Sequence, residues 1–126
     1  MLIAGAALAL LAVLAGAFAA HGLKATLDAQ QLAVFETAAR YQMYHAFALL
    51  VVGGLSTLSQ FPRRLLGFAA FAFSLGILLF SGSLYLLALS GIRWLGAITP
   101  LGGTAFILGW LLLIIAVTKT AADTNH

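Results

Sequence analysis

Two histidines are the side chains best suited to chemistry in this sequence. His21 follows a long apolar run, and His45 ends the stretch Tyr41-Gln42-Met43-Tyr44-His45. An imidazole can relay protons, ligate haem or bind a metal ion. Neither histidine has a second ligand three or four residues away, so we predict no metal site. The alternatives for the pair are axial haem ligation, a proton or ion pathway, or hydrogen bonds that only hold helices together.

No other set of side chains has the spacing of a catalytic site. The chain contains no cysteine, and none of its serines lies beside a histidine or in a nucleophile-elbow motif. Gly102-Gly103 lacks the lysine of a phosphate-binding loop. Glu36 and Arg40 are spaced as a surface ion pair on a helix, or Arg40 could contact an anion or a lipid headgroup. We therefore expect a protein that is not an enzyme and uses no cofactor.

The composition indicates what kind of protein holds these residues. Hydrophobic residues make up 63% of the 126 positions and charged residues 7%, against roughly 45–50% and about 25% in soluble domains. So little polar surface cannot cover a water-soluble globule, and the formal charge of +3 comes from scattered residues. The composition excludes a soluble monomer, a nucleic-acid-binding protein and a disulfide scaffold. It predicts an integral membrane protein.

Apolar runs and the polar segments between them divide the chain into four expected spans. About 20 residues suffice for a helix to cross about 30 Å of hydrocarbon. Asp28 and Gln31 have the spacing of a capping box, which predicts a helix start at Asp28. That helix is longer than the hydrocarbon is thick, so Glu36 and Arg40 are expected at headgroup level. The predicted fold is a single all-α four-helix membrane domain covering 1–126, with spans at about 2–20, 34–58, 65–90 and 98–118.

Small residues recur at helical spacing in every expected span. Association in lipid depends on close packing through small side chains, since apolar burial does not drive it there. Repeats of about 3.5 residues predict left-handed crossings. The expected helix-packing positions are Gly5, Gly16, Gly67, Ser74, Gly102 and Gly109.

Most remaining polar residues fall toward one end of the expected bundle, in the leaflet away from the termini. An ionisable group inside a membrane is costly and therefore suggests a function. We predict a polar cluster there, made of His21, Arg40, Tyr41, Tyr44, His45, Ser81, Tyr85 and Thr99. At the opposite end lie Arg63, Arg64 and Lys119, against Lys24 and Arg93, or these two and Arg40 if it is counted, and this small bias favours cytoplasmic termini.

Several short motifs together resemble a known family. They are GAFAAHGL at 16–23, YQMYHA at 41–46, FSGSLY at 80–85, TPLGG at 99–103 and Gly109-Trp110. This combination resembles the YgdD-like family of small uncharacterised membrane proteins, although Ala19 stands where a glycine is more usual. The resemblance implies a four-helix protein of the bacterial inner membrane, with relatives in eukaryotic organelles, and implies no established activity, cofactor or substrate. Its recurring polar positions correspond to His21, His45, Ser81, Tyr85 and Thr99.

These observations favour a non-enzymatic accessory, assembly or structural component that acts through helix faces in the membrane. Its expected partners are the lipid bilayer and either a second copy of the chain or a larger membrane complex, and no nucleic acid. One alternative is a small transporter or proton/ion conductor built around His45 and His21. The other is a haem protein with His21 and His45 as axial ligands.

Overall fold

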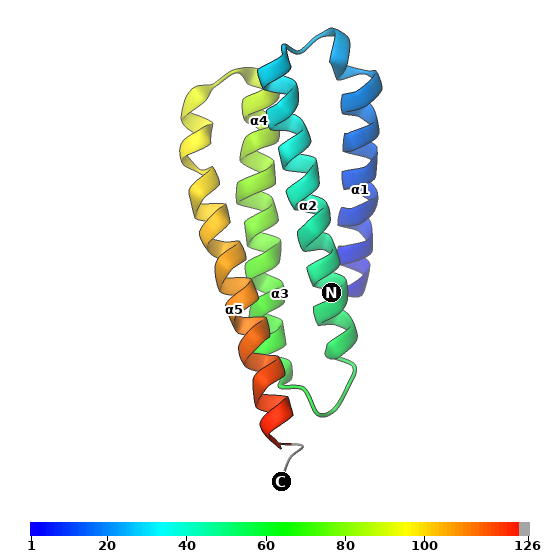
Figure 1. Ribbon diagram of the computed structural model, residues 1–126, viewed down its shortest axis with the longest axis vertical. Coiled ribbons are helices and arrows are strands. Elements are labelled where there is room, and N and C mark those ends of the chain that lie inside the picture. The colour runs from blue at the N-terminus through cyan, green and yellow to red at the C-terminus, as the bar shows by residue number, and fades with distance from the viewer. Residues whose placement is uncertain (124–126) are drawn as a thin grey trace.

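The structure, a computed structural model, describes residues 1–123 and is all-helical over that range (Figure 1). The predicted four-helix bundle is confirmed. Its third helix is continuous from Arg63 to Ser90 but contains one π-helical turn, η2. The elements are α1 (Leu2–His21), η1 (Leu23–Ala25), α2 (Ala29–Leu55), α3 (Arg63–Gly76), η2 (Ile77–Ser81), α4 (Gly82–Ser90), η3 (Arg93–Ala97) and α5 (Thr99–Asp123).

Both ends of α2 are set by side chains that bond to the backbone. The Asp28 carboxylate accepts from the Gln31 backbone N–H at 2.8 Å, and the Gln31 side-chain oxygen accepts from the Asp28 N–H at 3.2 Å. The predicted capping box is therefore present. At the other end, the Ser56 and Thr57 hydroxyls donate to the carbonyls of Gly53 and Gly54, at 2.7 Å each. These bonds compete with helix continuation, which explains why α2 ends at Leu55 and not at Leu58.

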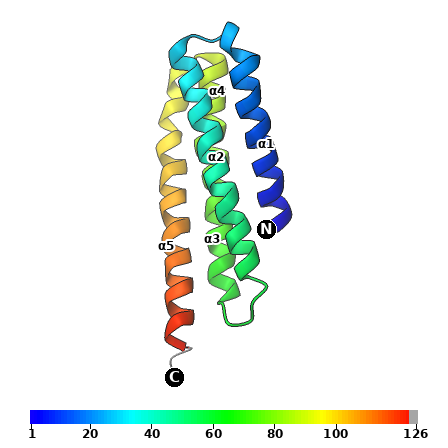
Figure 2. The ribbon, with the colours of Figure 1, turned by 45° about the vertical axis from the view of Figure 1, so that its right-hand side comes forward.

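Three of the four helices are long and apolar enough to cross a membrane. These segments are Leu2–Ala25, Arg63–Ser90 and Arg93–Ala122. The exception is α2, which carries Arg40, Gln42 and His45 among its apolar residues. It lies in the middle of the bundle and packs against α1, α3, η2 and α4 (Figures 1 and 2). Its neighbours bury Gln42 and His45, so α2 tolerates these two polar side chains where a peripheral span would not, whereas Arg40 is exposed.

The first helix occupies the edge of the bundle. It packs mainly against α2, whereas α5 packs against α3 and η2. The start of α1 and the end of α5 lie toward one end, and the connections at 22–28 and 91–98 lie at the other (Figure 2). The main core joins α2, α3 and α5 around Leu49, Val52, Leu66 and Phe73. The smaller cluster of Ala19, Leu23, Phe35 and Ala88 holds α1 to α2 and α4 near the connections.

The small residues differ in how closely they pack. A Cβ on Gly102 would lie 2.3 Å from the backbone nitrogen of Phe80, and one on Gly109 would lie 2.7 Å from the Phe73 ring. A Cβ on Gly5 would lie 3.0 Å from the carbonyl oxygen of Ala46. These three glycines permit close helix contacts.

Three other expected packing positions do not have this role. A Cβ on Gly16 or Gly67 would meet nothing within 4 Å. Ser74 is exposed, and its hydroxyl donates to the carbonyl of Ala70 in its own helix. Gly67 and Ser74 therefore do not lie on the contact face of α3.

Candidate functional site

His45 joins the middle of α2 to α5. Its Nδ1 lies 2.7 Å from the carbonyl oxygen of Tyr41, and the indole Nε1–H of Trp110 donates to its Nε2 at 3.3 Å. A carbonyl only accepts and an indole N–H only donates, so the proton of the imidazole lies on Nδ1. Both ring nitrogens are therefore used, and the neutral imidazole satisfies both partners.

Aromatic side chains surround this imidazole. The His45 ring is stacked on Phe106, with centroids 3.4 Å apart and an interplanar angle of 5°. Phe73 and Trp110 complete the surroundings, at 5.8 and 6.1 Å from the His45 ring. Only 5% of His45 is exposed. This arrangement favours the expected role of a hydrogen-bonded imidazole that holds helices together.

Gln42 links three helices and was not among the expected site residues. Its amide nitrogen donates to the carbonyl of Leu8 in α1 at 2.9 Å, and its amide oxygen accepts from the Tyr85 hydroxyl in α4 at 2.9 Å. Beside it, the Ser81 hydroxyl donates to the carbonyl of Ala38 at 2.8 Å. An amide inside an apolar span was the available sequence signal, because such a group needs interhelical partners.

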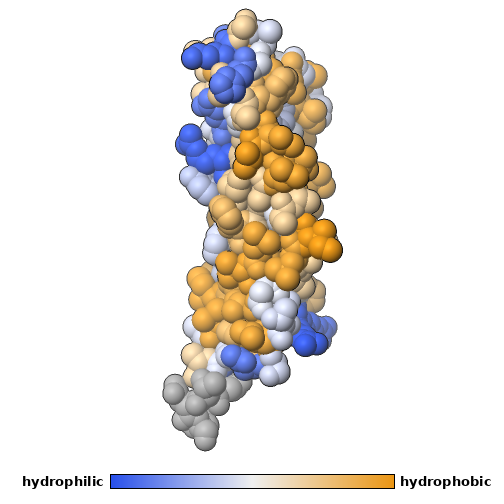
Figure 3. Space-filling view, turned by 90° about the vertical axis from the view of Figure 1, so that its right-hand side faces the viewer, coloured by the Kyte–Doolittle hydropathy of each residue, from blue (hydrophilic) through white to orange (hydrophobic). Residues whose placement is uncertain are grey.

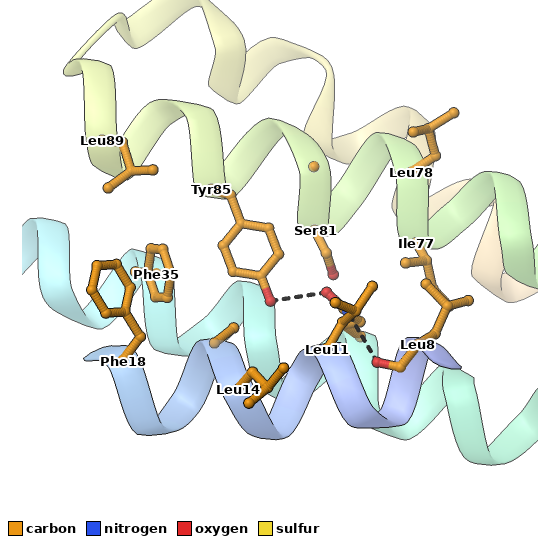
Figure 4. Close-up of a pocket in the computed structure, with 13 residues that line it drawn as sticks. Leu8, Leu11, Leu14, Phe18, Phe35, Ile77, Leu78, Ser81, Tyr85 and Leu89 are labelled. Atoms are coloured by element: carbon orange, nitrogen blue, oxygen red, sulfur yellow. Dashed lines mark hydrogen bonds between the residues drawn. The ribbon is translucent and has the colours of Figure 1, made fainter. Parts of the chain in front are cut away.

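These bonds form the floor of a groove between α1 and α4 (Figure 4). Its volume is about 630 Å³. Leucines of α1 form one side, and residues of η2 and α4 form the other. The lining residues are Leu8, Leu11, Leu14, Ala15, Phe18, Phe35, Gln42, Ile77, Leu78, Ser81, Gly82, Tyr85 and Leu89.

His21 lies far from His45. It is exposed at the end of α1, whereas the α1 residue level with Ala46 is Gly5, as their close approach shows. His21 is 16 residues beyond Gly5, which corresponds to about 24 Å along the helix. Two axial ligands must both reach one iron, so this separation disfavours the alternative in which the two histidines share a haem.

The remaining expected residues contact several different neighbours, so the structure does not gather the predicted polar cluster at one place. Ser83 and Thr99 share a hydrogen bond of 2.8 Å between α4 and α5. Tyr41 and Tyr44 are exposed, with ring centroids 5.7 Å apart. Arg40 is exposed beside a cavity of about 380 Å³ between α1 and α2. The side chains on α2 point to different neighbours because a helix turns by about 100° per residue.

Charged groups do not form an internal site. Among the described residues, no ion pair joins Glu36 to Arg40, although both line the cavity between α1 and α2. Within the same part of the chain, no three His, Cys, Asp or Glu side chains gather in a way that could hold a metal ion. The site with the most interhelical bonds is therefore the neutral network of Gln42, Tyr85 and Ser81 in the groove floor.

Comparison of the sequence with known proteins places the chain in a family. A family model described as "Protein of unknown function (DUF423)" matches residues 15–103. The chain is 48% identical over 120 residues to the UPF0382 membrane protein YwdK of Bacillus subtilis (strain 168), covering 94% of this chain and 95% of the relative. It is 49% identical over 118 residues to the UPF0382 membrane protein SSP2132 of Staphylococcus saprophyticus, covering 94% and 96%. No solved structure matches the chain.

Proposed function

This chain belongs to the DUF423 family, whose relatives are named as bacterial membrane proteins, and we propose that it is a non-enzymatic accessory, assembly or structural component of a membrane. In this proposal it acts through the outer faces of its helices. The connections between helices are short, so the helix faces form nearly all of the surface that another molecule could contact.

One observation carries the proposal: the polar side chains in the interior are used to hold helices together. His45 bonds α2 to α5, Gln42 bonds α2 to both α1 and α4, and Ser83 bonds α4 to α5. Among the described residues, every buried side-chain nitrogen or oxygen has a hydrogen-bond partner. A catalytic or transport site needs a reactive group that substrate can reach, and these groups are already engaged.

We further propose that the protein lies in the inner membrane with both termini in the cytoplasm. Arg63 and Arg64 begin α3 and Lys119 lies in the last turns of α5, whereas Lys24 lies in η1 and Arg93 in η3, at the opposite end of the bundle. Cytoplasmic loops carry the excess of Lys and Arg in inner-membrane proteins. Reporter fusions at the C-terminus and in the connection at 91–98 would test this orientation.

Extraction in a mild detergent tests the proposed function. We expect the tagged protein, expressed at its natural level, to copurify with a second copy or with another membrane protein in a fixed ratio. Cross-linking before extraction should give the same species, which guards against loss of a partner in detergent. A monomer without a partner in both experiments would overturn the proposal.

A further inference from the structure

The groove between α1 and α4 is open along its side. The two helices do not pack on each other over its length, because each is held by α2 and by the interhelical bonds of Gln42. Leu11, Leu14, Phe18, Leu78 and Leu89 border it and are all more than half exposed. In Figure 4 these side chains stand on opposite sides of the groove, with Tyr85 and Ser81 pointing toward its floor.

The polar side chains in the groove floor are hydrogen-bonded within the protein and do not require a polar ligand. The Tyr85 hydroxyl donates to Gln42, Gln42 donates to the carbonyl of Leu8, and Ser81 donates to the carbonyl of Ala38. These bonds satisfy the polar atoms within the protein, and the rest of the lining is hydrocarbon. The chemistry of the lining therefore fits an occupant that is itself a hydrocarbon.

The length of the groove fits one leaflet of the bilayer. Its α1 side runs from Leu8 to Phe18 and its other side from Ile77 to Leu89, which is about 15 Å and about 18 Å of helix. The hydrocarbon core is about 30 Å thick. A transmembrane helix of a partner crosses both leaflets and would extend beyond this groove, whereas a single acyl chain has the matching length and lies parallel to the helices.

Two basic side chains lie beyond the groove, at the end where Asp28 lines a separate cavity together with Arg93. After Phe18 the chain reaches Lys24 in the turn that follows α1, and after Leu89 it reaches Arg93 in η3. Both side chains are exposed at the same end of the bundle. Figure 3, which faces the α1 side, shows hydrophilic residues gathered at this end above an apolar middle. Cations at headgroup level attract anionic lipids.

We propose that this groove is a binding site for one acyl chain of an anionic phospholipid, from the leaflet at the end of Lys24 and Arg93. The chain lies between α1 and α4, and its headgroup lies at the level of the two cations. A lipid held in this way stays with the protein in a fixed ratio, unlike the lipid that exchanges along the outer face of α5. This inference goes beyond the proposed function, since lipid binding and association with a partner are measured separately.

Two glycines provide a matched pair of variants. Gly82 lines the groove, and a Cβ there would meet nothing within 4 Å, so Gly82→Leu fills the groove without disturbing the backbone. Gly67 is equally open but lies in α3, outside the groove. Gly67→Leu therefore makes the same change of size and apolarity at a position where the proposal predicts no effect.

The experiment uses the full-length protein in vesicles of phosphatidylcholine with a small fraction of phosphatidylglycerol that carries a photoactivatable diazirine in its acyl chain. We expect cross-links to peptides containing Leu11, Leu14 and Leu78, reduced at least five-fold by Gly82→Leu and unchanged by Gly67→Leu. Cross-links to α5 serve as the reference for exchanging lipid and should be equal in all three proteins. Equal labelling of the groove and of α5, or groove labelling that survives Gly82→Leu, would overturn the acyl-chain site.

The headgroup is tested with the same probe on phosphatidylcholine. We expect groove labelling to be several-fold weaker with this zwitterionic probe, and the combined change Lys24→Gln and Arg93→Gln should abolish the difference between the two probes. Equal groove labelling by both probes in the unaltered protein would overturn the preference for an anionic lipid. Native mass spectrometry of the bundle from mild detergent should show one retained phospholipid, which Gly82→Leu removes.

Discussion

Replacing Gly102 by alanine should separate α5 from the π-helical turn η2. The added Cβ would lie 2.3 Å from the backbone nitrogen and 2.7 Å from the Cα of Phe80. Backbone atoms cannot rotate away, so the helices must move apart by about 1 Å, which forfeits a quarter to a half of each dispersion contact across the gap. Overpacking costs about 1–3 kcal/mol and the alanine returns about 1 kcal/mol of helix propensity. We expect a net loss of about 1 kcal/mol, and at most about 2 kcal/mol, in the free energy of unfolding.

The neighbouring glycine provides the control. A Cβ on Gly103 would lie 4.0 Å from the Phe80 ring, which is an ordinary contact distance. Gly103→Ala should therefore be neutral or stabilise the protein by up to about 1 kcal/mol. Reversible unfolding in mixed micelles of dodecyl maltoside and sodium dodecyl sulfate, followed by tryptophan fluorescence, measures both variants. If Gly102→Ala is as stable as the unaltered protein, or if both variants lose stability equally, the close contact of α5 with Phe80 is refuted.

Two further experiments examine the interhelical hydrogen bonds in the same unfolding assay. A double-mutant cycle of His45→Ala and Trp110→Phe should show a coupling free energy of about 0.6 to 1.7 kcal/mol, as interhelical hydrogen bonds in membranes do. If the effects of the two substitutions were strictly additive, the hydrogen bond from Trp110 to His45 would be refuted. Tyr85→Phe should lower the free energy of unfolding by about the same amount. Gln42 loses the hydroxyl that donates to it, while the ring at position 85 keeps its contact with Phe35, at 4.8 Å between centroids. An unchanged free energy of unfolding would mean that the hydrogen bond between Tyr85 and Gln42 does not stabilise the bundle.

The sequence predicted the helices well because their signals are local. An uninterrupted apolar run of spanning length and a capping box at Asp28 are each readable without knowing what the helix packs against. The end of α2 was placed three residues too late. There the decisive interactions were the bonds of Ser56 and Thr57 to the preceding turn, and their competition with the helix is not visible in hydropathy.

The polar site was predicted poorly because depth in the membrane does not define direction around a helix. Tyr41, Gln42 and His45 lie within five residues on α2, yet they turn respectively to the outer surface, to α1 and α4, and to α5. Grouping residues by leaflet put His21 with His45, which the antiparallel packing of α1 on α2 separates. It also passed over Gln42, whose importance depends on two helices that meet only in the folded bundle.

The placement of these polar groups on α2 accounts for which helices lie next to one another in the bundle. In lipid, apolar contact with another helix gains little over apolar contact with an acyl chain, so directional bonds and close backbone approach must specify the neighbours. A central helix can bond to several neighbours at once, and α2 does so through Gln42 and His45. The cost of their polarity is offset because all of their partners lie within the bundle. The two helices bonded to Gln42 are those that border the groove, so the bonds that fix the fold also hold the groove open.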